Sequence, residues 1–187
     1  MLKIILFVVF IFCLIKIDYS QSNIRLEGIG GKIGYIIPES PVYNTFSFSA
    51  HAELGSIFNR VYVGAIAEFW SKSYNSNVLP NNYLDGKWTE FILAPTFKLK
   101  YYTGTKAITY IGGGVGFEIV SFKNDMWNVS QSFKLTSTKL DAALFFFGGA
   151  EYPITPRIKG VGEIKFHVDG ENFLGFYLGA TYLLPTK

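Results

Sequence analysis

Glycine-rich stretches are the first feature of the sequence that could carry chemistry. "TYIGGGVGFE" covers residues 109–118, and "GIGGKIGY" covers residues 28–35. A phosphate-binding Walker loop needs a lysine followed by serine or threonine where a helix begins, whereas Lys32 is followed by Ile33. A dinucleotide-binding loop needs a third glycine where Phe117 stands. The sequence therefore favours no nucleotide site, and we interpret these glycines as strand residues that make room for large neighbours.

Carboxylates form the second candidate group. Glu90 and Glu118 come opposite or nearly opposite each other when the chain folds back at "YTGTK", with Glu68 one segment further round. Two buried acids at that range oppose each other's ionisation or require a cation. The alternative is an acidic wall that faces basic residues across an interior, since pairing makes buried charge tolerable. We favour the paired arrangement and predict no metal site and no cofactor.

The segments that carry these residues alternate between apolar and polar side chains with period two. In "TEFILAPTFKLKY", Phe91 and Phe97 fall on one face, while Glu90 and Lys98 fall on the other. This alternation is typical of β-strands with two different faces. It predicts eight strands, at roughly 24–37, 43–54, 60–72, 87–101, 106–122, 133–152, 157–168 and 172–184.

The connections between these segments also alternate. "GSIFNR", "YTGTK" and "PITPR" are tight turns, whereas "SKSYNSNVLPNNYLDG" and "FKNDMWNVSQS" are long and polar, and "PESPV" and "VDGEN" are short. Tight turns at one end and longer loops at the other are typical of membrane barrels. The sequence thus predicts an all-β fold, an eight-stranded antiparallel up-and-down transmembrane β-barrel.

The composition of the two faces decides which one points inward. A soluble secreted barrel would place the apolar faces inside, but their many phenylalanines exceed what a narrow eight-stranded interior holds. We therefore expect lipid outside and a mixed-charge lumen that forms a closed salt-bridge network. The residues expected on the lumen face include Lys32, His51, Glu53, Glu68, Glu90, Lys98, Lys100, Glu118, Lys139, Asp141, Glu151, Lys159, Glu163, Lys165 and His167.

The first twenty residues differ from the rest of the chain. A short basic start precedes the apolar run "IILFVVFIFCLI", which indicates a signal peptide over residues 1–20, and the barrel domain then covers residues 21–187. The chain's single cysteine, Cys13, lies in this segment, so we expect no disulfide in the mature protein. Loss of Lys3, Lys16 and Asp18 changes the net charge from +3 to +2, too little to suggest nucleic-acid binding.

The mature chain resembles the small eight-stranded outer-membrane β-barrel domains of the porin family, the OmpA-like and OmpX-like group. The resemblance lies in the architecture, in the GxGxxxG spacing of the first strand, and in "LGATYLL", where Gly179, Tyr182 and Leu184 match the family's assembly signal. The chain departs from that signal by ending in "LLPTK" instead of a terminal phenylalanine. The resemblance implies a Gram-negative outer membrane, periplasmic termini and outward loops. The expected partners are outer-membrane lipid and the outer-membrane assembly machinery, and the expected state is a monomer.

Some barrels of this size are lipid A acyl-chain hydrolases or transferases, which makes His167 the best catalytic candidate. Hairpin geometry about "PITPR" places Asp141 near it, and Asp169 lies two residues on. The deacylase pattern has a serine where Asp169 stands, so Ser137 on the neighbouring strand is the substitute. The alternative is a histidine that ends the charge network.

Three tryptophans, Trp70, Trp88 and Trp127, belong to the loop side of the predicted barrel. Aromatic rings gather at membrane interfaces, so we expect an aromatic girdle or loop packing, with a carbohydrate- or protein-binding surface as the alternative. We predict a non-enzymatic outer-membrane barrel with a structural or surface-interaction role. The alternatives are an outer-leaflet lipid A-modifying enzyme centred on His167 and a narrow channel for small or apolar solutes.

Overall fold

A computed structural model describes residues 23–38, 44–58, 60–79, 82–102, 106–128, 131–168 and 172–185. The predicted signal peptide lies outside these residues. Eight strands follow one another: β1 (Asn23–Pro38), β2 (Thr45–Phe58), β3 (Val61–Leu79), β4 (Asn82–Tyr102), β5 (Ile108–Asn128), β6 (Gln131–Thr155), β7 (Ile158–His167) and β8 (Phe173–Leu183).

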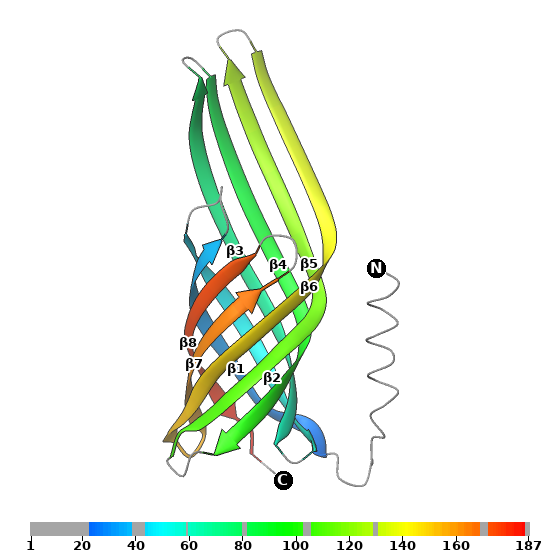
Figure 1. Ribbon diagram of the computed structural model, residues 1–187, viewed down its shortest axis with the longest axis vertical. Helices are drawn as coiled ribbons and strands as arrows, with labels where there is room; N and C mark the ends of the chain where they lie inside the picture. The colour runs from blue at the N-terminus through cyan, green and yellow to red at the C-terminus, as the bar shows by residue number, and fades with distance from the viewer. Residues whose placement is uncertain are drawn as a thin grey trace.

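The strands close into a single barrel in chain order (Figure 1). Each strand pairs antiparallel with the next, and β8 pairs antiparallel with β1. The predicted fold class is therefore confirmed. In the described part of the chain, no helix is long and apolar enough to cross a membrane.

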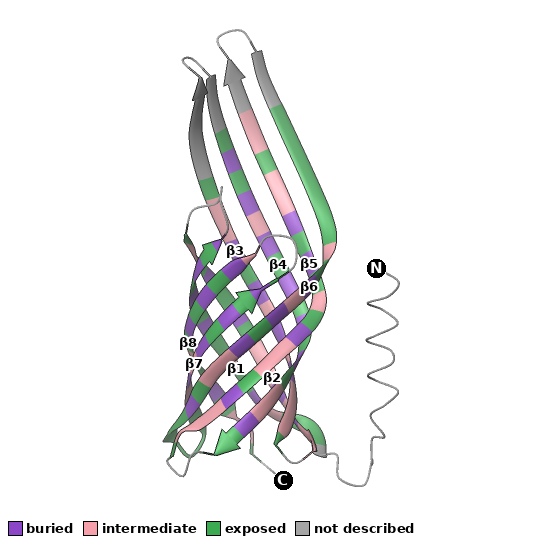
Figure 2. Cartoon of the chain, in the orientation of Figure 1, coloured by how far each residue is buried: buried purple, intermediate pink, exposed green. Residues whose placement is uncertain are grey.

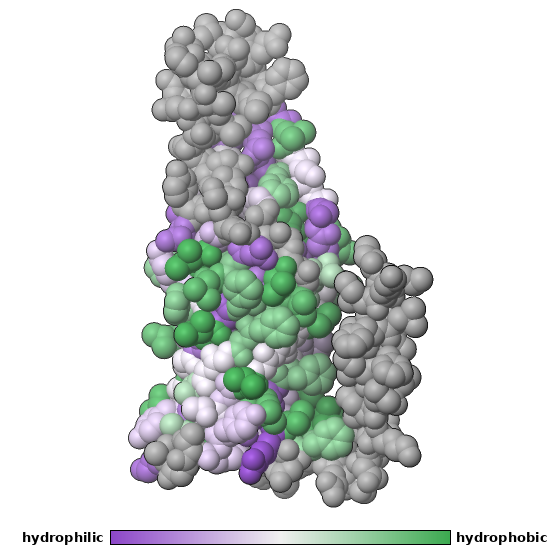
Figure 3. All heavy atoms as spheres, in the orientation of Figure 1, coloured by the Kyte–Doolittle hydropathy of each residue, from purple (hydrophilic) through white to green (hydrophobic). Residues whose placement is uncertain are grey.

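Burial alternates along the strands, so one face of each strand points into the lumen (Figure 2). In β7, Lys165 and His167 are buried, whereas Ile164 and Phe166 are about half exposed. The outward faces of all eight strands carry large exposed apolar side chains, among them Ile33, Phe48, Phe69, Leu93, Phe117, Phe146, Ile164 and Leu178. On the face seen in Figure 3, apolar side chains gather in a band at the level of the barrel. Such a band is stable against lipid hydrocarbon, since closure leaves no unpaired strand edge there.

Four strands, β3 to β6, extend well beyond the others as a protruding sheet (Figure 1). The prediction of long loops at 71–86 and 122–132 is wrong, because these residues continue the ladders. Ser71 pairs with Thr89, and the β3–β4 ladder continues to Leu79 and Asn82. The β5–β6 ladder continues to Asn128 and Gln131. The polar composition of these segments left no apolar alternation to detect, because strands that extend beyond the membrane need no apolar face. They were therefore predicted as loops.

Glycines of β5 provide space for aromatic rings in the lumen. A Cβ atom on Gly112 would collide with the ring of Phe147, and one on Gly114 would collide with the ring of Phe145. Both phenylalanines lie on the neighbouring strand, where Gly112 pairs with Phe147 and Gly114 pairs with Phe145. The glycine-rich stretch is thus a strand whose missing side chains let two rings lie across the lumen.

Candidate functional site

The lumen contains a lysine-rich cluster near the turn end of the barrel, formed by Glu53, Lys98, Lys100, Glu151 and Lys159. Glu151 is fully buried and contacts three lysines. Its Oε2 accepts hydrogen bonds of 2.9 Å from Lys100 Nζ and from Lys159 Nζ, and its Oε1 lies 3.5 Å from Lys98 Nζ. Lys159 Nζ also donates to Glu53 Oε2 at 2.8 Å. The cluster therefore joins strands β2, β4, β6 and β7 through opposite charges.

A second set of contacts lies next along the lumen, around Glu163. Lys32 Nζ donates to Glu163 Oε1 at 2.5 Å, and the Tyr110 hydroxyl donates to Glu163 Oε2 at 2.9 Å. Because both carboxylate oxygens have a donor, this buried charge is paired and hydrogen-bonded.

Glu68 is the centre of a third set of contacts. Lys165 Nζ forms a buried ion pair with Glu68 Oε2. The hydroxyl groups of Ser47 and Tyr177 donate to Glu68 Oε1 at 2.6 Å and 2.5 Å. Alternation placed Lys165 and Glu68 in the lumen, but Tyr110, Tyr177 and Ser47 were not predicted as hydrogen-bonding partners. Their positions on the inward face of the period-two pattern could have indicated that they lie in the lumen.

Side chains leave little free space between these charges. A cavity beside Lys32, His51, Glu53 and Lys98 has a volume of about 20 Å³, which is room for a water molecule. Lysine ammonium groups also lie over lumen rings, with Lys98 Nζ 4.7 Å from the Tyr110 ring centre and Lys165 Nζ 4.7 Å from the Tyr177 ring centre. Charges and rings together fill this part of the lumen.

Towards the loop end, Glu90, Glu118 and His167 form a different group, which we name the Glu–Glu–His cluster. All three residues are buried, with exposed fractions of 1% or less. One carboxylate or ring-nitrogen atom from each lies within 4.8 Å of the other two. His167 Nε2 is 3.5 Å from Glu118 Oε2. The predicted lysine partner of Glu90 is absent from the ion pairs among the described residues, so the acidic-wall interpretation is wrong for this residue.

Aromatic rings surround the Glu–Glu–His cluster on its loop side. Trp70 and Trp88 stack at 6.4 Å with an interplanar angle of 3°, and Phe122 meets Trp88 edge-on at 3.9 Å. Trp70 and Trp88 are buried in the lumen. The predicted aromatic girdle or loop packing is therefore wrong for these two residues. Trp70 lies within β3 and Trp88 within β4, and both side chains point into the lumen. The side chain of Trp127 lies outside the described residues.

Lys139 and Asp141 do not join the lumen network. Their side chains pair with each other at 2.5 Å between Nζ and Oδ2, and the Lys139 side chain is 66% exposed. The reason is the unequal length of the strands. β7 ends at His167, which pairs with Phe145, so the part of β6 that holds Lys139 has no following strand to enclose it.

The structure does not bring the candidate catalytic residues His167, Asp141 and Ser137 together. The partner of His167 in the register is Phe145, which puts Ser137 eight residues further along β6, roughly 26 Å away at the usual rise of a strand. Asp141 is roughly 13 Å along the same strand by this measure. Instead, the His167 ring stacks between Phe145 and Phe173, at 6.2 Å and 4.7 Å. Asp169 lies outside the described residues.

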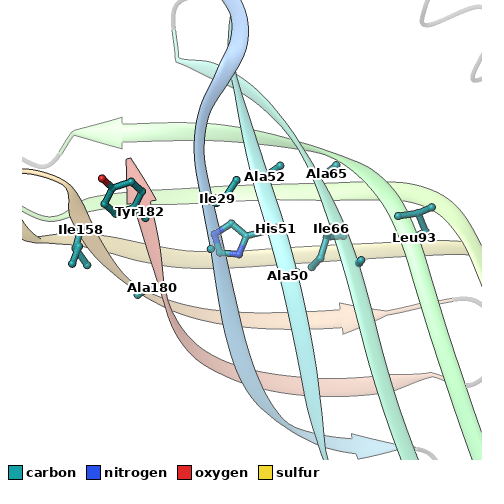
Figure 4. A pocket seen from close by; sticks show the side chains of 12 residues that line it. Ile29, Ala50, His51, Ala52, Ala65, Ile66, Leu93, Ile158, Ala180 and Tyr182 are labelled. Carbon is teal, nitrogen blue, oxygen red and sulfur yellow. The ribbon is translucent and has the colours of Figure 1, made fainter. Parts of the chain in front are cut away.

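A shallow hollow of about 710 Å³ lies on the outer wall of the barrel (Figure 4). It forms where β1, β2, β3 and β8 carry small side chains, including Ala50, Ala65 and Ala180, between Tyr182 on β8 and Leu93 on β4. Because it belongs to the lipid-facing surface, it offers room to an acyl chain and is not a passage through the lumen.

Comparisons with known proteins support the fold. No family model and no curated protein matches the sequence. Among solved structures, Neisserial surface protein A (NspA) is similar with a TM-score of 0.54 and 10% identity, over 84% of this chain and 96% of that one. A major outer membrane protein from Thermus thermophilus is similar with a TM-score of 0.54 and 11% identity, over 84% of this chain and 99% of that one. The chain thus has the fold of small outer-membrane β-barrels, which supports the predicted outer-membrane location.

Proposed function

We propose that this protein is a non-enzymatic outer-membrane β-barrel whose lumen is plugged by charge pairs and whose protruding sheet serves as an interaction surface. The observation that carries the proposal is the contrast between a filled lumen and a four-stranded sheet that extends beyond it. A barrel that only filled space in the membrane would not need strands of nineteen to twenty-five residues.

The protruding sheet has two edges. The last pair between β2 and β3 is Ser47 with Trp70, and the last pair between β6 and β7 is Phe145 with His167. The carbonyl oxygens of Ser71 and Leu144 still accept hydrogen bonds from Thr45 and Val168. Beyond Ser71 and Leu144, the described parts of β3 and β6 pair with a strand on one side only. Such edges bind an additional extended strand through main-chain hydrogen bonds. Leu135 and Leu140 on β6 are each 66% exposed and add apolar contact area.

Photo-crosslinking on intact cells tests the interaction surface. A photoreactive amino acid at Leu135 should crosslink to protein at the cell surface. The control is Phe117, which is equally exposed at 66% but belongs to the lipid-facing band, and should crosslink to lipid alone. Identical lipid crosslinks at both positions would refute a surface role for the sheet.

Conductance in planar bilayers tests the plug. The pairs around Glu151, Glu163 and Glu68 support a closed lumen, and we expect no stable single-channel steps from the wild-type barrel. Reproducible conductance would favour the channel alternative. The lipid A alternative has less support, because Ser137 and Asp141 lie away from His167, and unchanged lipid A masses in His167→Ala cells would argue against it.

A further inference from the structure

Three side chains of metal-ligand type come from three strands to one point of the lumen. Glu90 is on β4, Glu118 is on β5 and His167 is the last residue of β7. Glu90 pairs with Val120 and Glu118 pairs with Ile92, so the two acids are diagonal neighbours on adjacent strands. Their ligand atoms and that of His167 lie within 4.8 Å of one another.

Glu90 provides an independent sign that a ligand belongs here. Its exposed fraction is 1%, and its Oε1 atom is buried with no donor at normal hydrogen-bond geometry, while the indole N–H groups of Trp70 and Trp88 are its nearest polar neighbours. A buried carboxylate oxygen without a donor costs free energy of folding. Two lysines of the lumen already form ion pairs with other glutamates: Lys165 pairs with Glu68, and Lys32 pairs with Glu163.

The charge of the cluster points to the kind of ligand. Two carboxylates lie side by side in a buried space, and ionising both would place excess negative charge there. A single divalent cation would neutralise them and would accept the unused Glu90 oxygen as a ligand. Buried charges are tolerated when they are paired or bind a metal ion.

We propose that Glu90, Glu118 and His167 bind a divalent transition-metal cation, with Zn²⁺ as the best match. One imidazole nitrogen and two carboxylate oxygens suit Zn²⁺, whereas Ca²⁺ and Mg²⁺ prefer oxygen ligands throughout. Three protein ligands leave a fourth tetrahedral position for water. Ligand atoms around a tetrahedral ion are about 3.4 Å apart at Zn²⁺ bond lengths, so binding requires the two flexible glutamates to draw together slightly.

The surroundings hold the ligands in place. The His167 ring lies between the parallel rings of Phe145 and Phe173, with interplanar angles of 14° and 8°, which fixes its plane. Trp88 and Phe122 lie on the loop side of the acids and shield them from water. A dry, fixed shell of this kind strengthens the attraction between an ion and its ligands.

The position of the site suggests what the ion does. β7 ends at His167, and beyond this level β3 to β6 leave the barrel as the protruding sheet (Figure 1). An ion bound here ties β4 and β5 to the end of β7. It would therefore act as a clamp at the base of the sheet.

Metal titration of the full-length protein in detergent micelles tests this proposal. After removal of metal with a chelator, Co²⁺ should bind with one ion per barrel, produce visible absorption and quench the fluorescence of the nearby tryptophans, and Zn²⁺ should displace it. The substitutions Glu90→Gln, Glu118→Gln and His167→Gln should each weaken binding by more than about tenfold, because each removes one of three protein ligands.

His51→Gln is the matched control, since it removes the chain's other histidine. His51 Nε2 is 2.8 Å from the Thr181 hydroxyl and belongs to a different part of the lumen, so Co²⁺ binding should be unchanged. The shift of gel mobility on heating reports that each variant is folded. If His167→Gln fails to fold, Glu90→Gln and Glu118→Gln decide, because each relieves repulsion between the two acids.

Two results would overturn the proposal. One is the lack of saturable Co²⁺ or Zn²⁺ binding to the folded wild-type barrel, which would mean that a proton alone balances the cluster. The other is binding that persists at the same strength in all three variants, which would place the metal elsewhere on the protein. Neither result bears on the surface role of the protruding sheet, which the crosslinking experiment tests separately.

Discussion

The lysine-rich cluster and the Glu–Glu–His cluster lie in the same lumen, but they balance charge in different ways. The lysine-rich cluster has three lysines around two glutamates, and each charged group meets an opposite charge within 4 Å. The Glu–Glu–His cluster has two glutamates and a histidine, and Glu90 meets no cation among the described residues. The first cluster balances its charges within the protein, whereas Glu90 in the second would need a proton or the proposed ion. The mixed-charge lumen thus contains two clusters that differ in how their charges are balanced.

The largest expected effect comes from breaking the complete cluster. Glu151→Gln removes the carboxylate that contacts Lys98, Lys100 and Lys159, so three ammonium groups of the lumen would share Glu53 alone. Breaking a buried ion pair in this way costs about 3–5 kcal/mol of folding free energy. Urea unfolding in lipid vesicles, followed by tryptophan fluorescence, measures the loss. A change below about 1 kcal/mol would mean that water already shields these charges, contrary to a closed plug.

The next effect tests the rings between the clusters. Gly114→Val would place a side chain against the Phe145 ring, which packs on His167 on one side and lies 5.0 Å from Lys165 Nζ on the other. Overpacking of this kind costs about 1–3 kcal/mol. Gly31→Val is the control, because the nearest atom to its added Cβ is the Ser49 carbonyl oxygen at 3.5 Å. Equal unfolding midpoints for the two variants would contradict the packed-ring arrangement.

A smaller effect of opposite sign is expected in the Glu–Glu–His cluster. In the presence of a chelator, Glu90→Gln removes one of two neighbouring negative charges and should stabilise the barrel by about 1 kcal/mol. With Zn²⁺ added, the wild type should regain the advantage, because it alone keeps all three ligands. Unfolding curves with and without Zn²⁺ measure both changes. If Glu90→Gln lowers stability in the presence of a chelator, Glu90 has a cation partner within the protein.

The smallest effect is expected outside the closed lumen. Lys139→Ala removes an exposed pair with Asp141 on the same strand, and such surface pairs contribute about 0–1 kcal/mol. The unfolding midpoint should stay close to that of the wild type, and added salt should reduce any remaining difference, because it screens exposed charges. A large loss would mean that Lys139 is enclosed after all.

The alternation of side chains predicted most of the fold and much of the lumen. Glu68 and Lys165 were placed inside because they alternate with Phe69 and Phe166, and the structure agrees. The pairing between distant strands could not be predicted, since register shifts of two residues leave the alternation unchanged. For this reason Asp141 was expected near His167, and Glu90 was expected near a lysine. The lengths of β3 to β6 were underestimated because polar residues in water give no sign of pairing.

The sequence by itself determined the class of the fold and the side of the wall on which each strand residue lies, because period two is a local property that needs no knowledge of the partner strand. Only the tertiary structure decided which charges meet. Barrel closure and unequal strand lengths bring Glu151 to three lysines, leave Lys139 in solvent, and gather Glu90, Glu118 and His167 from three strands. These outcomes depend on register and on where each strand ends, and those are set by the packing of the whole ring.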